Sequence, residues 1–422
     1  MSNRPSRAMN AAEKKAVSAL AGIFALRMFG LFMLLPVLAV YAARLPASTP
    51  LLVGLALGVY GLTQGLLQFA FGAASDRFGR KRVITAGLLV FAAGSVIAAL
   101  ADSITGLIIG RAIQGAGAIS AAALALTADL TGEQQRTKAM AVIGVSIGAV
   151  FILSLMLAPP LQGAIGVTGI FYLGAGLAAV AVGVLWRVVP NPAAGAVADA
   201  VIDPRPWAQR FGGILADRQL MRLNAGVFCL HLSLTAVFVV LPQMLQEKSG
   251  LPLAGHWKLY APVLLLSVVG MLPLVYLGSH NRGIAAAFAG AVALLASATA
   301  SMAWAVGAGA GLLALLAALW LFFVAFNALE ALLPSLVSRI APATGKGAAI
   351  GAYNTFQFLG MFAGGAVAGW LSGRFGAAGV YAACAAVTGL WLLGVAAAPK
   401  FRLDSGDREM PAIGARSHWD SR

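Results

Sequence analysis

Charged residues are scarce in this sequence, and their scarcity limits what the protein can be. Of its 422 residues only 10% are Asp, Glu, Lys or Arg, whereas 60% are hydrophobic. Soluble domains carry about 25% charged residues. A chain so poor in charge cannot cover a surface that faces water, so we expect an integral membrane protein embedded in the lipid bilayer.

Residues that build catalytic and metal sites are also scarce. The chain has two cysteines, Cys229 and Cys384, and four histidines, so it has no disulfide framework and no Cys/His cluster with metal-ligand spacing. The segment Gly345-Lys346-Gly347 lacks the Ser/Thr and the upstream glycine of a phosphate-binding loop. We therefore expect no enzymatic activity, no metal and no cofactor. A gradient, such as that of protons, would have to supply the energy for transport.

Apolar runs follow one another along the whole chain. A transmembrane helix needs about 20 apolar residues. Twelve runs of about this length are present, near residues 17–41, 51–74, 83–101, 105–130, 139–161, 167–186, 223–245, 257–278, 283–305, 311–338, 347–372 and 378–398. The sequence thus predicts an all-α integral membrane protein with twelve transmembrane helices.

The longest polar stretch divides these runs into two sets of six. It is rich in proline and mixed charges and contains no apolar segment of spanning length, which is typical of a linker. The predicted organisation is a cytoplasmic segment, a six-helix half, a cytoplasmic linker, a second six-helix half and a cytoplasmic tail. Their boundaries are 1–15, 16–187, 188–221, 222–399 and 400–422.

Cations are distributed unevenly among the predicted connections. If Met1 lies inside, the outer connections contain only four cations, Arg44, Lys248, Lys258 and Arg374. Nearly all other Lys and Arg residues then lie on the inner side, as the positive-inside rule requires. The net charge of +15 therefore indicates topology and not nucleic-acid binding. We expect both termini in the cytoplasm and no nucleic-acid partner.

Two motifs carry a family resemblance. The connection between the second and third spans reads Gly72-Ala-Ala-Ser-Asp76-Arg77-Phe-Gly79-Arg80-Lys81-Arg82, and the fourth span contains Ile109-Gly-Arg111-Ala-Ile-Gln114-Gly115-Ala-Gly117. Both resemble signatures of the major facilitator superfamily, and the second signature is found in proton-coupled members. Over about residues 10–400 the chain resembles the drug/proton antiporter branch. A bacterial member of that branch adds a small soluble domain after its last span, and we expect no such domain here.

This resemblance implies the major facilitator fold, with two pseudo-symmetric six-helix halves in a bacterial inner membrane. It also implies that the charged connection is a conformational latch. We expect Asp76 close to the N-terminus of span 347–372, since a carboxylate gains about 0.3–1 kcal/mol at a helix N-terminus. The alternative is that the cations of this connection only set the topology. The expected latch residues are Gly72, Asp76, Arg77, Gly79, Arg80 and Asp129.

Ionisable side chains at membrane depth are costly and mark functional sites by default. Glu330 is the only acid deep within the apolar runs, and we expect it to carry the proton; the alternative is a permanent ion pair with an arginine. The resemblance places Arg111 near the coupling site, with a structural arginine capped by carbonyls as the alternative. Arg27 stands in the first span, where many drug antiporters have an acid. We assign it to proton coupling and expect a cationic cavity wall that disfavours lipophilic cations.

Uncharged polar residues in the spans that line the central cavity of this family are candidates for substrate contact. The alternative for each is a hydrogen bond between helices or, for the histidine, an interior packing role. The expected cavity residues are Gln114, Asn224, His231 and Asn327.

These features predict a secondary active transporter that binds a small-molecule substrate. We expect proton-coupled efflux of small amphipathic compounds by alternating access, carried out by a monomer. Proton-coupled or facilitated uptake of a metabolite is the alternative, and a membrane sensor without transport is a third possibility. The fifth span supports antiport poorly, because Ala158-Pro159-Pro160-Leu-Gln162-Gly163 keeps only the proline and the last glycine of the antiporter signature.

Overall fold

A computed structural model describes residues 9–191, 207–280, 283–341 and 346–397 of the chain. Within these ranges all regular secondary structure is helical, and no strand is present. Residues 192–206 of the predicted linker, the predicted tail and residues 342–345 before the span at 347–372 lie outside the described residues. The predicted all-α membrane fold is confirmed.

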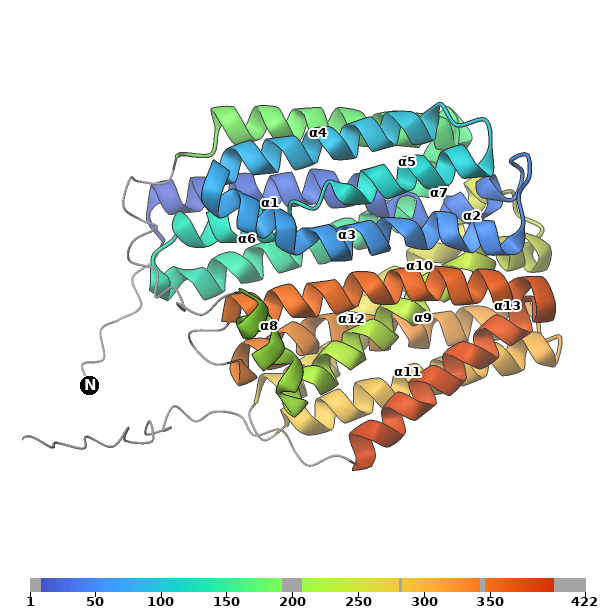
Figure 1. Ribbon diagram of the computed structural model, residues 1–422. Coiled ribbons are helices and arrows are strands. Elements are labelled where there is room, and N and C mark those ends of the chain that lie inside the picture. Colours follow the sequence, from blue (N-terminus) through green and yellow to red (C-terminus); the bar gives the residue numbers. More distant parts are fainter. Residues whose placement is uncertain (1–8, 192–206, 281–282, 342–345, 398–422) are drawn as a thin grey trace, which may run out of the picture.

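The first half comprises seven helices, which pack mainly on one another (Figure 1). These are α1 (Ala11–Phe32), α2 (Leu35–Ala42), α3 (Pro50–Phe78), α4 (Arg80–Ala99), α5 (Ile104–Ala116), α6 (Ser120–Asp129) and α7 (Glu133–Arg187). The second half comprises α8 (Trp207–Ala216), α9 (Arg218–Ser249), the 3₁₀ turn η1 (Leu253–Gly255), α10 (Trp257–Ser279), α11 (Ile284–Gly307), α12 (Leu312–Ile340) and α13 (Lys346–Ala397). Helix α8 lies in the segment for which the sequence predicted a linker.

Helices α7 and α13 each cross the bundle twice. They contain 55 and 52 residues, more than twice the length of a membrane span. Each is broken by a glycine with positive φ, Gly166 (φ 69°) and Gly376 (φ 62°), a conformation that glycine adopts without steric cost. Ten continuous helical segments are long and apolar enough to cross a membrane. Because α7 and α13 each supply two crossings, the described chain has the twelve predicted spans.

Two of the predicted spans are interrupted. The first breaks at Met33 and Leu34, and Pro36 lies in the first turn of α2, where its missing N–H donor is tolerated as it would not be inside a continuous helix. The fourth breaks at Gly117, between α5 and α6. At this second break the Gly117 carbonyl accepts hydrogen bonds from the Ile119 N–H and from Arg27. The interruption of the fourth span thus creates part of a polar site.

The halves meet most closely where α3 crosses the first passage of α13. Gly54, Gly58 and Gly61 of α3 lie directly against the backbone of α13, and a Cβ atom added at Gly58 would lie only 2.8 Å from the Phe362 carbonyl oxygen. Small residues allow such close contact between membrane helices. The glycine face of α3 therefore joins the two halves.

Two ends of the bundle serve as reference points below (Figure 1). The terminal end is the one where α1 begins, α3 meets α4 at Gly79, and α13 ends. The far end is the opposite one and carries the connection between α2 and α3.

Candidate functional site

Arg27 of α1 forms the core of a polar cluster in the first half. Its side chain is fully buried, and its Nη2 atom donates to the hydroxyl of Tyr60 at 2.8 Å and to Oε1 of Gln64 at 2.6 Å. The same nitrogen lies 3.1 Å from the Gly117 carbonyl oxygen. The guanidinium also stacks on Phe91, 5.7 Å from its ring centroid. In this conformation Arg27 contacts only uncharged groups among the described residues, and the cationic cavity wall stays a prediction.

Arg111 of α5 lies on the other side of Tyr60. Its guanidinium carbon is 5.0 Å from the Tyr60 ring centroid, its Nη1 donates to Oε1 of Gln114, and its Nε donates to the Ala56 carbonyl at 3.2 Å. Gln114 in turn donates to Ser95 at 2.8 Å. Arg111 therefore has the carbonyl-capped environment that was the structural alternative. We call Arg27, Tyr60, Gln64, Arg111 and Gln114 the arginine cluster.

Glu330 of α12 lies in the second half beside His231 of α9. The carboxylate Oε1 is 3.6 Å from Nε2 of His231, beyond a normal hydrogen bond, and the described residues give this oxygen no other partner. About a third (34%) of the Glu330 side chain is accessible. No arginine of the described chain contacts it. The alternative of a permanent Glu330–arginine ion pair therefore finds no support in this conformation.

Two residues of α13 complete the surroundings of this acid. Gln357 places its amide nitrogen 2.8 Å from Nε2 of His231. Tyr353 is buried and close enough to feel the charge of Glu330, and its hydroxyl has no partner among the described residues. We call Glu330, His231, Gln357 and Tyr353 the carboxylate cluster. Neither Gln357 nor Tyr353 was predicted from the sequence, because nothing in the spacing along α13 distinguishes them from other polar residues of that helix.

Aromatic rings pack against the carboxylate cluster and join the halves. Phe326 lies edge-on to His231, with 5.7 Å between ring centroids, and stacks on Phe151 of α7 at 5.4 Å. Phe323, one turn away on α12, also contacts Phe151. These three phenylalanines are buried, so apolar rings from both halves cover the side of the cluster that faces α7.

The remaining predicted cavity residues have packing contacts in this structure. Asn327 donates to Ser267 of α10 at 3.0 Å. Asn224 is buried, with its amide 3.9 Å from the sulfur of Met221. Neither residue shares a hydrogen bond with the carboxylate cluster, whereas His231 does belong to it.

The predicted latch residues converge on Arg80 at the terminal end. Arg80 forms an ion pair with Asp76, donates to Asp129 of α6 at 3.0 Å and donates to Ser75 at 2.7 Å. Gly79, with φ 93°, provides the sharp change of direction between α3 and α4. Arg77 is exposed and stacks on Phe78, and Gly72 lies against Ala121 of α6. The expected contact of Asp76 with the start of span 347–372 falls partly on residues outside the described ranges.

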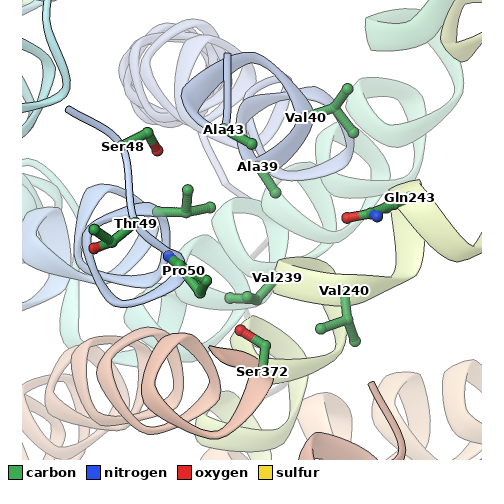
Figure 2. Close-up of a pocket in the computed structure, with 11 residues that line it drawn as sticks. Ala39, Val40, Ala43, Ser48, Thr49, Pro50, Val239, Val240, Gln243 and Ser372 are labelled. Atoms are coloured by element: carbon green, nitrogen blue, oxygen red, sulfur yellow. The ribbon is translucent and has the colours of Figure 1, made fainter. Parts of the chain in front are cut away.

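A hollow of about 300 Å³ lies between the halves at the far end (Figure 2). Its walls include Ala39 of α2, Thr49 before α3, Val240 of α9 and Ser372 of α13, and no charged side chain lines it. Val240 is nine residues beyond His231, or ~13 Å along a helix. The hollow is therefore separate from the carboxylate cluster. Because both halves contribute walls, any rocking of one half against the other must change its shape.

Comparisons with known proteins agree with this architecture. A model of the Major Facilitator Superfamily matches residues 20–365. The inner membrane transport protein YajR of Escherichia coli is 43% identical over 386 residues, which cover 91% of this chain and 83% of YajR. These matches support the family and do not confirm its drug/proton antiporter branch.

Solved structures of low sequence identity share the fold. A bacterial homologue of the human lysosomal transporter Spinster, in an inward-facing and occupied conformation, superposes with a TM-score of 0.73 at 13% identity and covers 92% of this chain and 96% of that one. The human organic anion transporter MFSD10 superposes with a TM-score of 0.65 at 21% identity and covers 92% of this chain and all of that one (100%).

Proposed function

Because the chain belongs to the major facilitator superfamily and is a membrane transporter of that type, we propose that it exports small amphipathic compounds in exchange for protons. The two halves would rock about the α3–α13 contact and expose a central site to one end of the bundle at a time. The terminal end would face the cytoplasm of a bacterium, and the protein would work as a monomer in the inner membrane.

The environment of Glu330 carries this proposal. It is the one acid of the described spans that lies deep in the bundle, ten residues before the end of α12. Burial away from water disfavours the charged form of a carboxylate, and a partner arginine would stabilise it. Glu330 has no such partner, and part of its side chain is accessible. A carboxyl group in this position is able to bind a proton from one side and release it to the other.

The arginines enter the proposal in a supporting role. Arg27 and Arg111 are 0% and 3% exposed and have neutral partners. In this conformation neither offers a positive charge to a substrate, so the position of Arg27 gives no reason to exclude cationic compounds. Their proposed contribution to proton coupling is indirect, through the Tyr60 ring, which lies 6.4 Å from the ring of Phe358 on α13.

The test is proton movement in liposomes that contain the purified protein and an internal pH dye. A panel of cationic, neutral and anionic amphipathic compounds is added outside. We expect at least one compound to trigger a proton flux in the wild type, and we expect the Glu330→Gln variant to lose it. The direction of the flux relative to the compound distinguishes exchange from co-transport and hence export from uptake.

Glu247→Gln is the matched control. Glu247 lies near the far end of α9 and bonds to Gln243, remote from the carboxylate cluster. The chemical change is the same, so this variant should keep the wild-type flux. A wild-type level of coupled flux in the Glu330→Gln variant would refute the role of Glu330, and the absence of flux with every compound would refute antiport for this panel.

A further inference from the structure

The hydrogen bonds around His231 fix which of its nitrogens carries the proton. Nδ1 lies 3.2 Å from the Val227 carbonyl oxygen, which only accepts, so Nδ1 must be the N–H donor. In the neutral ring Nε2 is therefore a lone-pair acceptor. That atom receives the Gln357 amide N–H at 2.8 Å. The two contacts are mutually consistent and define one tautomer.

The same Nε2 atom also faces Glu330. Oε1 of the carboxyl group is 3.6 Å away, so Gln357 and Glu330 compete for a single lone pair. While the proton resides on Glu330, the imidazole is neutral and Gln357 donates to it. When the proton passes from the Glu330 carboxyl oxygen to Nε2, the products are a carboxylate and an imidazolium, and Nε2–H points to the carboxylate.

The state with a Glu330 carboxylate and a His231 imidazolium is incompatible with the observed contact between Gln357 and His231. Nε2–H and the Gln357 amide N–H would then be two donors facing each other, and neither could accept. Gln357 has to turn its amide oxygen to His231 or move away with its helix. Gln357 is partly buried, and the loss of its hydrogen-bond partner costs free energy, so the position of the proton biases the position of α13.

Helix α13 also carries this bias to the other half. Phe358 follows Gln357 in the sequence and lies against Tyr60, and its carbonyl oxygen lies against Gly61 of α3. Tyr60 is the residue on which both arginines converge. Gln357, which contacts His231, is thus adjacent in the chain to Phe358, which packs on Tyr60 of the arginine cluster.

We propose that Gln357 is the positioning residue that couples proton transfer between Glu330 and His231 to the separation of α13 from α3. This inference rests on the proposed proton coupling. The titratable groups that face the pair from the packed helices are His231 on α9, Glu330 on α12 and Tyr353 on α13. Tyr353 does not compete for the proton, because its neutral phenol already carries one and phenols lose it only in strongly basic solution.

The test combines two measurements on full-length protein in lipid. Nitrogen-15 NMR of labelled histidine reports the tautomer and protonation of His231, which is one of four histidines and is assigned with a His231→Gln variant. Paired spin labels at Ala73 and Gly347, both exposed, report the separation of α3 and α13. They are attached to introduced cysteines after Cys229 and Cys384 are replaced by alanine. Gln357→Met keeps the size of the side chain and removes the amide, and Asn354→Leu is the matched change one turn away on α13.

In the wild type and in Asn354→Leu we expect the Nδ1–H tautomer at high pH and a change in label separation that follows the protonation of His231. In Gln357→Met the ratio of protonated to neutral His231 at a fixed pH should rise about fivefold, as expected for the loss of one hydrogen bond to the neutral form. The distance between the two spin labels should no longer change with the protonation of His231. A Gln357→Met variant with wild-type titration and wild-type helix movement would overturn the inference and leave Gln357 a packing residue.

These measurements need no substrate, so their outcome is independent of the flux assay. Helix movement that follows His231 in a protein without proton flux would refute the proposed function and keep the inference. Proton flux in both the wild type and Gln357→Met, at equal coupling, would keep the function and refute the inference.

Discussion

Arg27 and Glu330 are both ionisable side chains within membrane spans, but the protein surrounds them differently. Arg27 is fully buried, and its Nη2 donates to a phenol, an amide and a backbone carbonyl, whereas its Nε and Nη1 have no partner among the described residues. Glu330 is partly accessible, and its buried oxygen has no hydrogen-bond partner among the described residues. A permanently charged guanidinium needs a fixed set of acceptors. A carboxyl group that changes its charge cannot have one set of partners that suits both states. The contrast separates a structural centre from one suited to proton exchange.

The largest effect should come from removing the guanidinium. Arg27→Met would remove the three hydrogen bonds that the charged guanidinium donates to Tyr60, Gln64 and Gly117 in a buried site. Tyr60 would keep its 3.4 Å hydrogen bond to Gln64, and the Gly117 carbonyl would keep the one from the Ile119 N–H. Hydrogen bonds to charged groups contribute about 1.5–3 kcal/mol each, so we expect a loss of about 3 kcal/mol or more in stability. The measurement is the midpoint of thermal unfolding in detergent. Arg374→Met, at an exposed arginine that stacks on Trp370, should leave this midpoint almost unchanged. Equal midpoints for Arg27→Met and the wild type would contradict a structural role for this centre.

The next largest loss of stability should come from substitutions at the contact between α3 and α13, which connects the arginine cluster to the carboxylate cluster. In Gly58→Ala the new methyl group would lie 2.8 Å from the Phe362 carbonyl oxygen, so the helices must separate. Overpacking of this kind costs about 1–3 kcal/mol. Gly22→Ala in α1 is the control, because its methyl group would meet no atom within 4 Å. We expect a lower unfolding midpoint for Gly58→Ala and an equal or higher one for Gly22→Ala. If both variants behave alike, close packing at this crossing does not limit stability.

Removing the charge of Glu330 should change the stability in the opposite direction from removing that of Arg27. Glu330→Gln removes a charge that no described cation neutralises and keeps a side chain of the same size. Since burying an unpaired charge is unfavourable, we expect a gain in stability of up to about 1 kcal/mol. The same unfolding assay measures it at a pH above neutrality, where the wild-type carboxylate would be ionised. A loss of stability comparable to that of Arg27→Met would show that Glu330 is structural as well.

The sequence predicted the number of spans, because the length of an apolar run is a local property. It also identified Glu330, since an acid amid apolar residues stands out in one dimension. It did not predict that Arg27 and Arg111 would share Tyr60 or that Gln357 would contact His231. Those contacts depend on which faces of α3 and α13 meet across the two halves. The breaks at Leu34 and Gly117 were missed for a related reason, as an apolar run continues through both.

The smallest effect on stability should come from the latch, where two aspartates share Arg80 but differ in exposure. Asp76 is 65% exposed and Asp129 is 13% exposed. An exposed ion pair contributes about 0.2–1 kcal/mol, so Asp76→Asn should leave the unfolding midpoint nearly unchanged, whereas Asp129→Asn should lower it more. If Asp76 nevertheless holds the terminal end closed, its neutral variant should favour opening of that end. Labelling of single cysteines at the terminal end would then be faster in Asp76→Asn than in the parent protein. Equal labelling rates, together with equal stability, would leave Asp76 without a role as a latch and would support the alternative that the cations of this connection set only the topology.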